Sequence, residues 1–168
     1  MMAARPLLLA GVSLTLIGLS AVVRSDPLLL WNASGSAPIG LYAVTPVGDL
    51  HRGALVAVRP PPPLERWLVD NGFLGSGALL LKRAAAMAGA KVCRDGATIS
   101  VAGKIVATAR ERDQQGRLLP VWTGCRSLGN EVFLLNVDEP DSLDGRYFGP
   151  LGIDTIVGRA TPLWTTRP

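Results

Sequence analysis

The longest apolar segment of the chain lies near its N-terminus. Residues 6–23 carry no charge and are rich in Leu, Val and Ile. As a helix this segment would span about 27 Å, close to the thickness of the hydrocarbon core of a bilayer. Arg5 precedes the segment, and Arg24 follows it near Asp26. This distribution of charge favours a cytoplasmic N-terminus and an exported remainder.

The pattern therefore predicts a membrane anchor over residues 1–24 and an exported domain over residues 25–168. A cleavable signal peptide is the alternative interpretation of the same apolar segment. Because no clear Ala-x-Ala cleavage site follows it, a retained anchor is preferred. The expected location is then the inner (cytoplasmic) membrane, with the lipid bilayer as a partner and the domain on the periplasmic side. A length of 168 residues suggests one domain.

Beyond residue 42 the hydrophobic pattern changes to short segments separated by Gly and Pro. Alternating and β-branched positions predict strands at 54–59, 98–101, 104–106, 131–137 and 153–163. The second and third of these strands would form a hairpin around a glycine turn. Helical spacing predicts a short helix over 64–73, and the alanines of residues 78–89 favour a second helix over a strand. Many short strands and few helices predict a mainly β fold.

Composition and charge narrow the classes of function. The chain is 48% hydrophobic with a mean hydropathy of +0.31, and the N-terminal segment accounts for the excess. The net charge of +4 and the absence of basic runs that alternate with aromatics give no support to nucleic-acid binding. Two cysteines, Cys93 and Cys125, are expected to pair in an oxidising compartment, with two buried thiols as the alternative. A chain with two cysteines and one histidine does not readily supply a closed zinc site, so neither a metal nor a cofactor is expected.

The stretch 32–42 is the first candidate for chemistry. Ser34 and Ser36 flank Gly35, and Pro38 follows. An extended Ser-Gly-Ser would place both hydroxyls on one side of the backbone, and Gly35 would allow another backbone to approach closely. One hydroxyl could then attack a carbonyl while the other donates to the resulting oxyanion. A Ser/Gly-rich linker between an anchor and a domain is the alternative.

A serine nucleophile needs a base, and the sequence offers few. His51 is the only histidine and lies in a predicted loop, so a Ser-His-Asp triad is not favoured. Of the three lysines, Lys82 alone lies in a strongly apolar run, whereas Lys91 and Lys104 lie near turns. Desolvation would lower the pKa of Lys82 and favour the neutral amine that a base requires. An edge residue whose amine reaches water is the alternative for Lys82.

Three segments of the chain resemble the boxes of type I signal peptidases of the serine–lysine class. The closest resemblance is to the conjugative-transfer, TraF-type branch of that family. The matching segments are residues 34–38 (Ser-Gly-Ser-Ala-Pro, continuing as Pro-Ile-Gly-Leu-Tyr), 81–89 around the apolar lysine, and 142–149 (Ser-Leu-Asp-Gly-Arg-Tyr-Phe-Gly). Residues 116–125 are also similar to the TraF-type pattern. The matches run in the family's order from about Asn32 to Trp164.

The resemblance implies a signal-peptidase-like antiparallel β domain behind one N-terminal transmembrane helix. It also implies that Ser36 is the nucleophile and Lys82 the general base. The backbone N–H of Ser36 and the hydroxyl of Ser34 would form the oxyanion hole.

Three further residues take supporting roles in this resemblance. Ser142 would hydrogen-bond the amine of the catalytic lysine, and Asp144 and Arg146 would brace the site as an ion pair. For this pair the alternative is a surface ion pair of little effect. The chain departs from the family pattern at Gly145, where serine is usual, and at Ala90, where aspartate is common. These departures leave open the hydrogen bonding near the lysine and the turn after the lysine segment.

The implied activity is that of a membrane-bound serine endopeptidase that processes exported precursor proteins through an acyl-enzyme. The expected substrate is a membrane-associated precursor, a signal-peptide-bearing chain or a conjugative pilin-like subunit. A general type I signal peptidase is one alternative, and a catalytically inactive membrane-anchored assembly or binding module is another. TraF-type relatives are associated with pilin maturation in which the amino terminus of the substrate can replace water, so hydrolysis and cyclisation both remain open.

Overall fold

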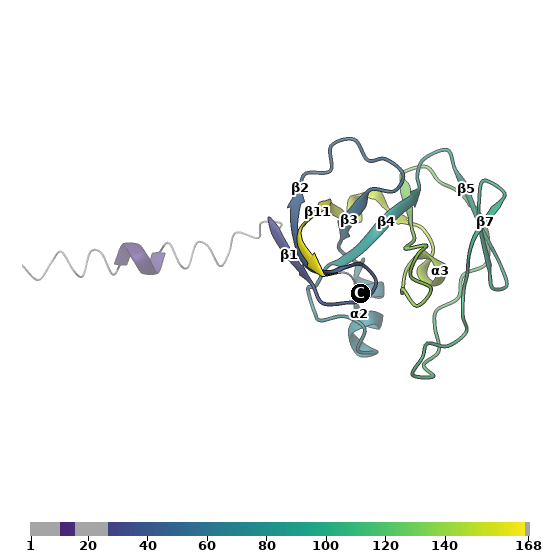
Figure 1. Ribbon diagram of the computed structural model, residues 1–168, viewed down its shortest axis with the longest axis horizontal. Coiled ribbons are helices and arrows are strands. Elements are labelled where there is room, and N and C mark those ends of the chain that lie inside the picture. Colours follow the sequence, from purple (N-terminus) through teal and green to yellow (C-terminus); the bar gives the residue numbers. More distant parts are fainter. Residues whose placement is uncertain (1–10, 16–26, 167–168) are drawn as a thin grey trace, which may run out of the picture.

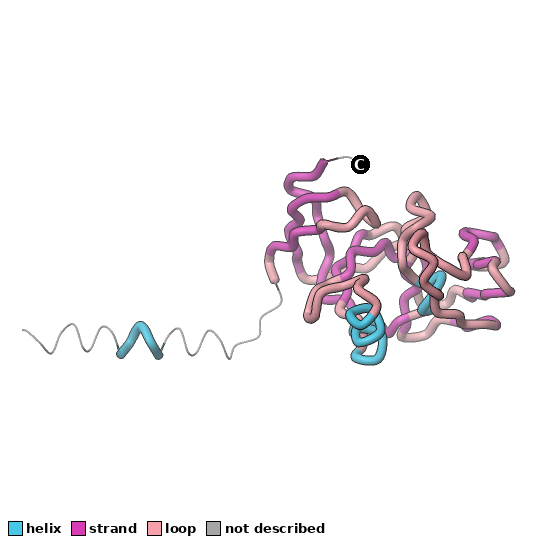
Figure 2. Tube along the Cα trace, turned by 90° about the horizontal axis from the view of Figure 1, so that it is seen from below, coloured by secondary structure: helices cyan, strands magenta, loops and turns pink. Residues whose placement is uncertain are grey.

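The computed structural model describes residues 11–15 and 27–166. Residues 27–166 form two antiparallel sheets with short helical segments (Figure 1). Strands and loops dominate, and helix is confined to short stretches (Figure 2). The expected mainly β, antiparallel fold is therefore confirmed.

The expected anchor over residues 1–24 lies outside the described residues, except for residues 11–15, which are helical. Among the helices of the described residues, none has the length and apolar character needed to span a bilayer. The boundary predicted between anchor and domain stays a prediction.

The larger sheet has seven strands in the order β1-β2-β11-β3-β4-β9-β10. These strands are β1 (Leu29–Asn32), β2 (Ile39–Thr45), β11 (Ile156–Thr166), β3 (Leu55–Val58), β4 (Leu80–Ala86), β9 (Glu131–Leu134) and β10 (Leu151–Gly152). Every neighbouring pair is antiparallel. One sheet thus carries both the loop between β1 and β2 and the lysine-bearing strand β4.

The smaller sheet has four strands in the order β7-β6-β5-β8. These strands are β5 (Lys91–Asp95), β6 (Thr98–Val101), β7 (Lys104–Thr108) and β8 (Gly124–Ser127). The hairpin predicted from the sequence is formed by β6 and β7. Its turn has φ of 50° at Ala102 and 77° at Gly103, as a tight two-residue hairpin turn requires.

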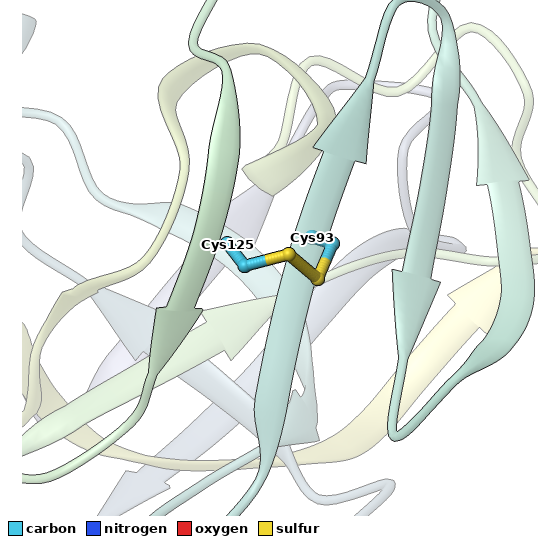
Figure 3. The surroundings of a disulfide bond; sticks show 2 residues. All are labelled: Cys93 and Cys125. Carbon is cyan, nitrogen blue, oxygen red and sulfur yellow. A yellow bond between two sulfur atoms is a disulfide. The ribbon is translucent and has the colours of Figure 1, made fainter.

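A disulfide crosslinks two strands of the smaller sheet. Cys93 on β5 lies directly opposite Cys125 on β8, with their Cα atoms 4.0 Å apart, and the two sulfurs are bonded (Figure 3). The expected pairing is therefore present, and the alternative of two buried thiols is wrong.

Each helical segment connects two strands of the larger sheet. The predicted short helix is α2 (Pro62–Asp70), and its first turn holds prolines, which remove no helical hydrogen bond there. A single turn, α3 (Gly145–Phe148), lies between the two sheets (Figure 1). A short 3-10 turn, η1 (Ile153–Thr155), precedes β11, so the last strand begins later than predicted. Strand β9 is likewise shorter than the segment predicted over 131–137.

The alanine-rich segment is a strand, so the helix favoured over residues 78–89 is wrong. Strand β4 pairs with β3 on one edge and with β9 on the other. Its Ala84 and Ala86 are buried in the hydrophobic core. Pairing on both edges overrides the intrinsic preference of alanine for a helix.

The hydrophobic core joins the two sheets. One cluster lies on the larger sheet around Val56, Val132 and Leu134. A second combines Phe133 of β9 with Val92 of β5 and with other side chains of the smaller sheet. Strand β9 therefore contributes to both clusters and fixes one sheet against the other.

We predict that Gly40→Ala will strongly lower the free energy of unfolding. Gly40 has φ of +147°, and an added Cβ would lie 2.1 Å from the backbone oxygen of Trp164 on β11. The backbone strain alone costs about 1–3 kcal/mol, and the clash would also separate β2 from β11. Urea unfolding measures the effect. Gly35→Ala is the control, because nothing lies within 4 Å of its added Cβ; equal stability of the two variants would contradict this account.

Candidate active site

The connection between β1 and β2 is a turn organised by one buried side chain, that of Asn32. Its Nδ2 donates to the carbonyls of Ser34, Ala37 and Pro38 at 2.9, 2.9 and 3.1 Å. Its Oδ1 accepts from the backbone N–H of Ser34 at 3.2 Å. The hydroxyl of Tyr42 donates to the Pro38 carbonyl at 2.5 Å. A single carboxamide therefore bonds four backbone groups of this turn, which gives the turn a defined shape.

Ser34 and Ser36 meet across this turn. Their Oγ atoms lie 3.0 Å apart, and the Oγ of Ser34 also donates to Asn32 Oδ1 at 2.9 Å. The expected extended conformation is wrong, because residues 34–37 form a bend and turn, and it is this turn that brings the hydroxyls together. The close approach expected at Gly35 is also wrong, since nothing lies within 4 Å of its added Cβ. A flexible linker is excluded, because the turn connects two paired strands.

Lys82 lies on β4 with its side chain inside the protein. It is only 2% exposed, and its Nζ donates to the Oγ of Ser142 at 2.8 Å. Burial lowers the pKa of Lys82 from 10.5 to about 8; the carboxylate of Asp144 raises this pKa, and the guanidinium of Arg146 lowers it further. The alternative in which Lys82 reaches water is therefore wrong. A lysine with such a pKa has a large neutral fraction near pH 8, and a neutral amine can accept a proton.

Asp144 and Arg146 form a buried ion pair whose two charges both act on the lysine amine. Arg146 Nε donates to Asp144 Oδ1 at 2.9 Å, and Nη2 donates to Oδ2 at 2.8 Å. Their side chains are 0% and 3% exposed, so this is not the surface pair of the alternative interpretation. Because removing one partner of such a pair leaves a buried charge unpaired, the pair fixes the local structure strongly.

The same arginine holds the chain that leads to Ser142. Its Nη1 donates to the carbonyl of Pro140 at 3.0 Å, and its Nη2 donates to that of Glu139 at 2.6 Å. From the smaller sheet, Arg94 Nη1 donates to the Arg146 carbonyl at 2.5 Å. The backbone before Ser142 is therefore held by Arg146, whose own carbonyl is bound from the smaller sheet.

Gly145, where serine is usual in the family, lies at a position without room for a side chain. An added Cβ would lie 2.6 Å from the Leu134 carbonyl and 2.7 Å from the Phe133 ring. Its carbonyl accepts a hydrogen bond from Trp122 Nε1 at 2.9 Å. Glycine is therefore what the packing of this chain requires. At the other departure, Ala90 N–H donates to the Met87 carbonyl at 3.0 Å, so backbone closes the turn after β4.

The sequence alone predicts no role for two asparagines. Asn32 is the first residue of the serine stretch, and Asn136 lies within the predicted strand 131–137. Asn136 is buried, and its Nδ2 donates to the carbonyl of Ser36. The available signal was a polar side chain directly after the apolar run that ends at Leu135. A buried amide needs partners, but the sequence does not reveal which ones.

A cleft of about 420 Å³ brings the polar candidates together. Its polar lining includes Ser34, Ser36, Lys82 and Ser142. The remaining walls are largely leucine, at positions 68, 74, 79, 80, 81 and 143. An apolar cleft with a few convergent polar groups is the usual form of a site that binds a ligand or peptide. Asp144 and Arg146 support the cleft through hydrogen bonds and do not line it.

The other candidates lie elsewhere. His51, Lys91 and Lys104 are exposed. The disulfide is in the smaller sheet. Within residues 11–15 and 27–166 no group of three or more His, Cys, Asp and Glu side chains could hold a metal ion.

Comparisons with known proteins give a consistent family. Residues 3–164 match the family described as signal peptidase, peptidase S26. A plasmid transfer protein TraF of Escherichia coli is 33% identical over 145 residues, which cover 80% of this chain and 81% of the relative. A conjugal transfer protein TraF of Agrobacterium fabrum is 31% identical over 148 residues, covering 82% of each chain. A probable conjugal transfer protein TraF of Sinorhizobium fredii is 29% identical over 180 residues, covering 98% of this chain and 92% of the relative.

Among solved structures, a signal peptidase I from Enterococcus faecalis matches with a TM-score of 0.39 and 19% identity, covering 68% of this chain and 99% of the other. That likeness is too low to carry an argument, so the assignment rests on the family match and on the sequence relatives. The chain belongs to the signal peptidase family, peptidase S26, and to its TraF-type branch.

Proposed function

We propose that the chain is a membrane-anchored serine endopeptidase that cleaves exported precursor proteins, with Ser36 as the nucleophile and Lys82 as the general base. The observation that carries this proposal is the buried amine of Lys82, which shares one cleft with Ser36. Its pKa of about 8 makes a neutral amine available under mild conditions. Membership of the S26 family suggests a serine peptidase independently of this geometry.

In the proposed reaction the Ser36 hydroxyl gives its proton to the neutral Nζ of Lys82 while Oγ bonds to the scissile carbonyl carbon. The carbonyl oxygen becomes an oxyanion, and the N–H of Ser36 and the hydroxyl of Ser34 donate hydrogen bonds to it. Collapse of this intermediate breaks the peptide bond. The leaving amine takes the proton from Lys82, and an ester remains on Ser36. Water then repeats the sequence and releases the acid.

Ser34 has to change partner during this reaction. Its hydroxyl has one hydrogen, which it donates to Asn32 Oδ1 at 2.9 Å. The Oγ of Ser36 lies 3.0 Å from the Oγ of Ser34. A rotation about the Cβ–Oγ bond would turn this hydrogen toward the oxyanion. Asn32 would therefore keep the Ser34 hydroxyl in place until charge develops.

Ser142, Asp144 and Arg146 are proposed to support the base. The Ser142 hydroxyl holds the lysine amine by a 2.8 Å hydrogen bond. The ion pair keeps the Ser142 segment in place through the arginine's bonds to the carbonyls of residues 139 and 140. None of the three exchanges a proton with the substrate in this scheme.

A conjugative pilin-like subunit is the proposed substrate, because the relatives are named plasmid transfer and conjugal transfer proteins. A general type I signal peptidase is the alternative within the same chemistry. An inactive assembly module is the alternative of another class. The presence of Ser36 and of a buried Lys82 in one cleft argues against the inactive module.

The inner membrane is the proposed location, with residues 1–24 as the anchor and the domain on the periplasmic side. The disulfide supports this placement, because disulfides persist in oxidising compartments. A second support is the outer face of β1, β2 and β11, three strands that lie side by side (Figure 1), of which β1 follows shortly after the predicted anchor in the sequence.

This outer face is apolar where a solvated sheet face is normally polar. Trp31 and Trp164 are both register partners of Leu41 on the strand between them, and their rings lie 6.0 Å apart. The two tryptophans are 54% and 64% exposed, and Leu29 and Ile39 on the same face are also exposed. Tryptophan favours the interface of a membrane. We therefore propose that this face rests on the lipid surface into which the anchor inserts.

The first prediction of this section concerns the two reacting groups. Ser36→Ala and Lys82→Met should abolish precursor cleavage and labelling by a serine-directed acylating inhibitor. Lys82→Arg should not restore activity, because a guanidinium stays protonated. Ser34→Ala should lower the rate by about 10²–10³ if its hydroxyl is an oxyanion donor. His51→Ala is the control and should keep full activity; full activity of either the Ser36 or the Lys82 variant would refute the mechanism.

The second prediction concerns pH. Activity should rise with pH around a midpoint near 8, because Lys82 must lose its proton to act as the base. Below pH 8 the lysine is protonated in both the folded and the unfolded chain, so the folded state bears the full cost of the buried charge. This cost disappears as pH rises from 8 toward 10.5.

Lys82→Met should therefore raise the melting temperature at pH 7, and its advantage should shrink above pH 10. Lys91→Met at an exposed position is the control and should show no such dependence on pH. Calorimetry at several pH values measures both variants. A destabilised Lys82→Met chain at pH 7 would contradict the burial cost.

The third prediction concerns the membrane face. In the full chain reconstituted into vesicles, lipids with brominated acyl chains should quench much of the tryptophan fluorescence. The chain has four tryptophans, and Trp31→Phe combined with Trp164→Phe should remove most of this quenching. The matched control changes Trp67 and Trp122, which pack in the domain. Equal quenching of the two double variants would exclude contact between this face and lipid.

A further inference from the structure

Strand β9 ends beside β4, and a side chain continues its hydrogen bonding. The last backbone bond between the two segments runs from Leu135 N–H to the Arg83 carbonyl at 2.9 Å. Beyond it, Asn136 Oδ1 accepts from Arg83 N–H at 2.9 Å, and Nδ2 donates to the Leu81 carbonyl at 3.3 Å. The carboxamide thus replaces a peptide group and fixes the backbone on both sides of Lys82.

A primary amide has a second N–H hydrogen, which a peptide group lacks. In Asn136 the same Nδ2 also donates to the carbonyl of Ser36, a residue 100 positions away in the sequence. The orientation of the amide follows from its partners, because Arg83 N–H requires an oxygen, whereas the two carbonyls require the nitrogen. One side chain therefore joins the backbone of the nucleophile to the backbone of the base.

The main chain of Asn136 is itself fixed by the buried ion pair. Its N–H donates to Asp144 Oδ2 at 3.1 Å, and its carbonyl accepts from Arg146 Nη2 at 3.2 Å. The same ion pair also holds the segment that leads to Ser142, because Arg146 donates to the carbonyls of residues 139 and 140. The serine turn, strand β4 and the Ser142 segment therefore meet at this one residue, which is 4% exposed.

We propose that Asn136 is a positioning residue that sets the separation between Ser36 and Lys82. This inference rests on the proposed function, because it concerns the geometry of that reaction. Proton transfer requires the two groups to come within hydrogen-bond reach, and a misplacement of about 1 Å can cost about 10²-fold in rate. A purely structural role in the core is the competing explanation, since any buried amide needs partners.

The test compares Asn136→Ala and Asn136→Asp with the wild type in the full chain. Alanine removes all three side-chain bonds, and aspartate keeps an acceptor for Arg83 N–H but loses both donors. We expect kcat to fall by at least about 10-fold, with a smaller change in KM, at a pH high enough that Lys82 is neutral in every variant. Since the base is then fully deprotonated, the loss reports geometry rather than protonation.

Two controls separate positioning from stability. Asn71→Asp makes the same chemical change at an asparagine whose Nδ2 donates to the Trp67 carbonyl at 2.8 Å, within helix α2 and its cap. Val92→Ala weakens the fully buried core of the smaller sheet. Both should lower stability while leaving kcat per folded molecule unchanged. A wild-type kcat in folded Asn136→Ala protein would overturn the proposal.

Hydrogen exchange gives a measurement that does not depend on activity. Backbone amides of residues 33–37 should exchange faster in both Asn136 variants and stay at the wild-type rate in the controls; unchanged exchange would also overturn the proposal. If the wild type neither cleaves nor is labelled, the proposed function fails, and exchange alone still decides whether Asn136 holds the turn. Should neither variant fold, NMR of the wild type replaces them: both Nδ2 hydrogens of Asn136 should be protected, and rapid exchange of either one would refute the contact with Ser36.

Discussion

The exclusion of water from one amine is the condition on which the rest of the site depends. Lys82 would carry a charge in water, and the protein makes that charge unfavourable by burying the side chain beside β4, a strand that is paired on both edges. The lowering of its pKa from 10.5 to about 8 corresponds to a cost on the order of 3 kcal/mol. Such a cost is a sizeable part of the stability of a small domain, so favourable interactions elsewhere in the fold have to offset it.

The charged residues around Lys82 stabilise the site without restoring its ordinary pKa. A lone carboxylate near Lys82 would restore its charge, but Asp144 is paired with Arg146, and the two act on the lysine in opposite directions. The pair can therefore hold the segment of Ser142 by hydrogen bonds, while its two charges have opposing effects on the pKa of Lys82. In this arrangement the ion pair fixes the backbone near Ser142, and burial lowers the pKa of Lys82.

Sequence and structure agree where the signal is local or carried by a family pattern. The hairpin at Ala102 and Gly103, the short helix and the cysteine pair could all be predicted, as could four polar residues of the cleft, namely Ser34, Ser36, Lys82 and Ser142. The helix predicted for the alanine-rich segment is wrong, because local propensity carries no information about the two strands that pair with it. The roles of Asn32 and Asn136 could not be predicted, because their partners are backbone carbonyls that only the fold brings near them, in one case across 100 residues.

The glycine at position 145 has a consequence for anyone who would redesign this protein from its relatives. Replacing a residue by the one most common in its family usually stabilises a protein, and that choice here would be serine. The new Cβ would lie 2.6 Å from a backbone carbonyl and 2.7 Å from the ring of Phe133. A backbone carbonyl cannot move aside as a flexible side chain can. The serine expected from the family therefore does not fit the packing around position 145 in this chain. Gly145, the Phe133 ring and the Leu134 carbonyl form one packing unit, so a grafted segment with a side chain at position 145 would also require the backbone of β9 to move.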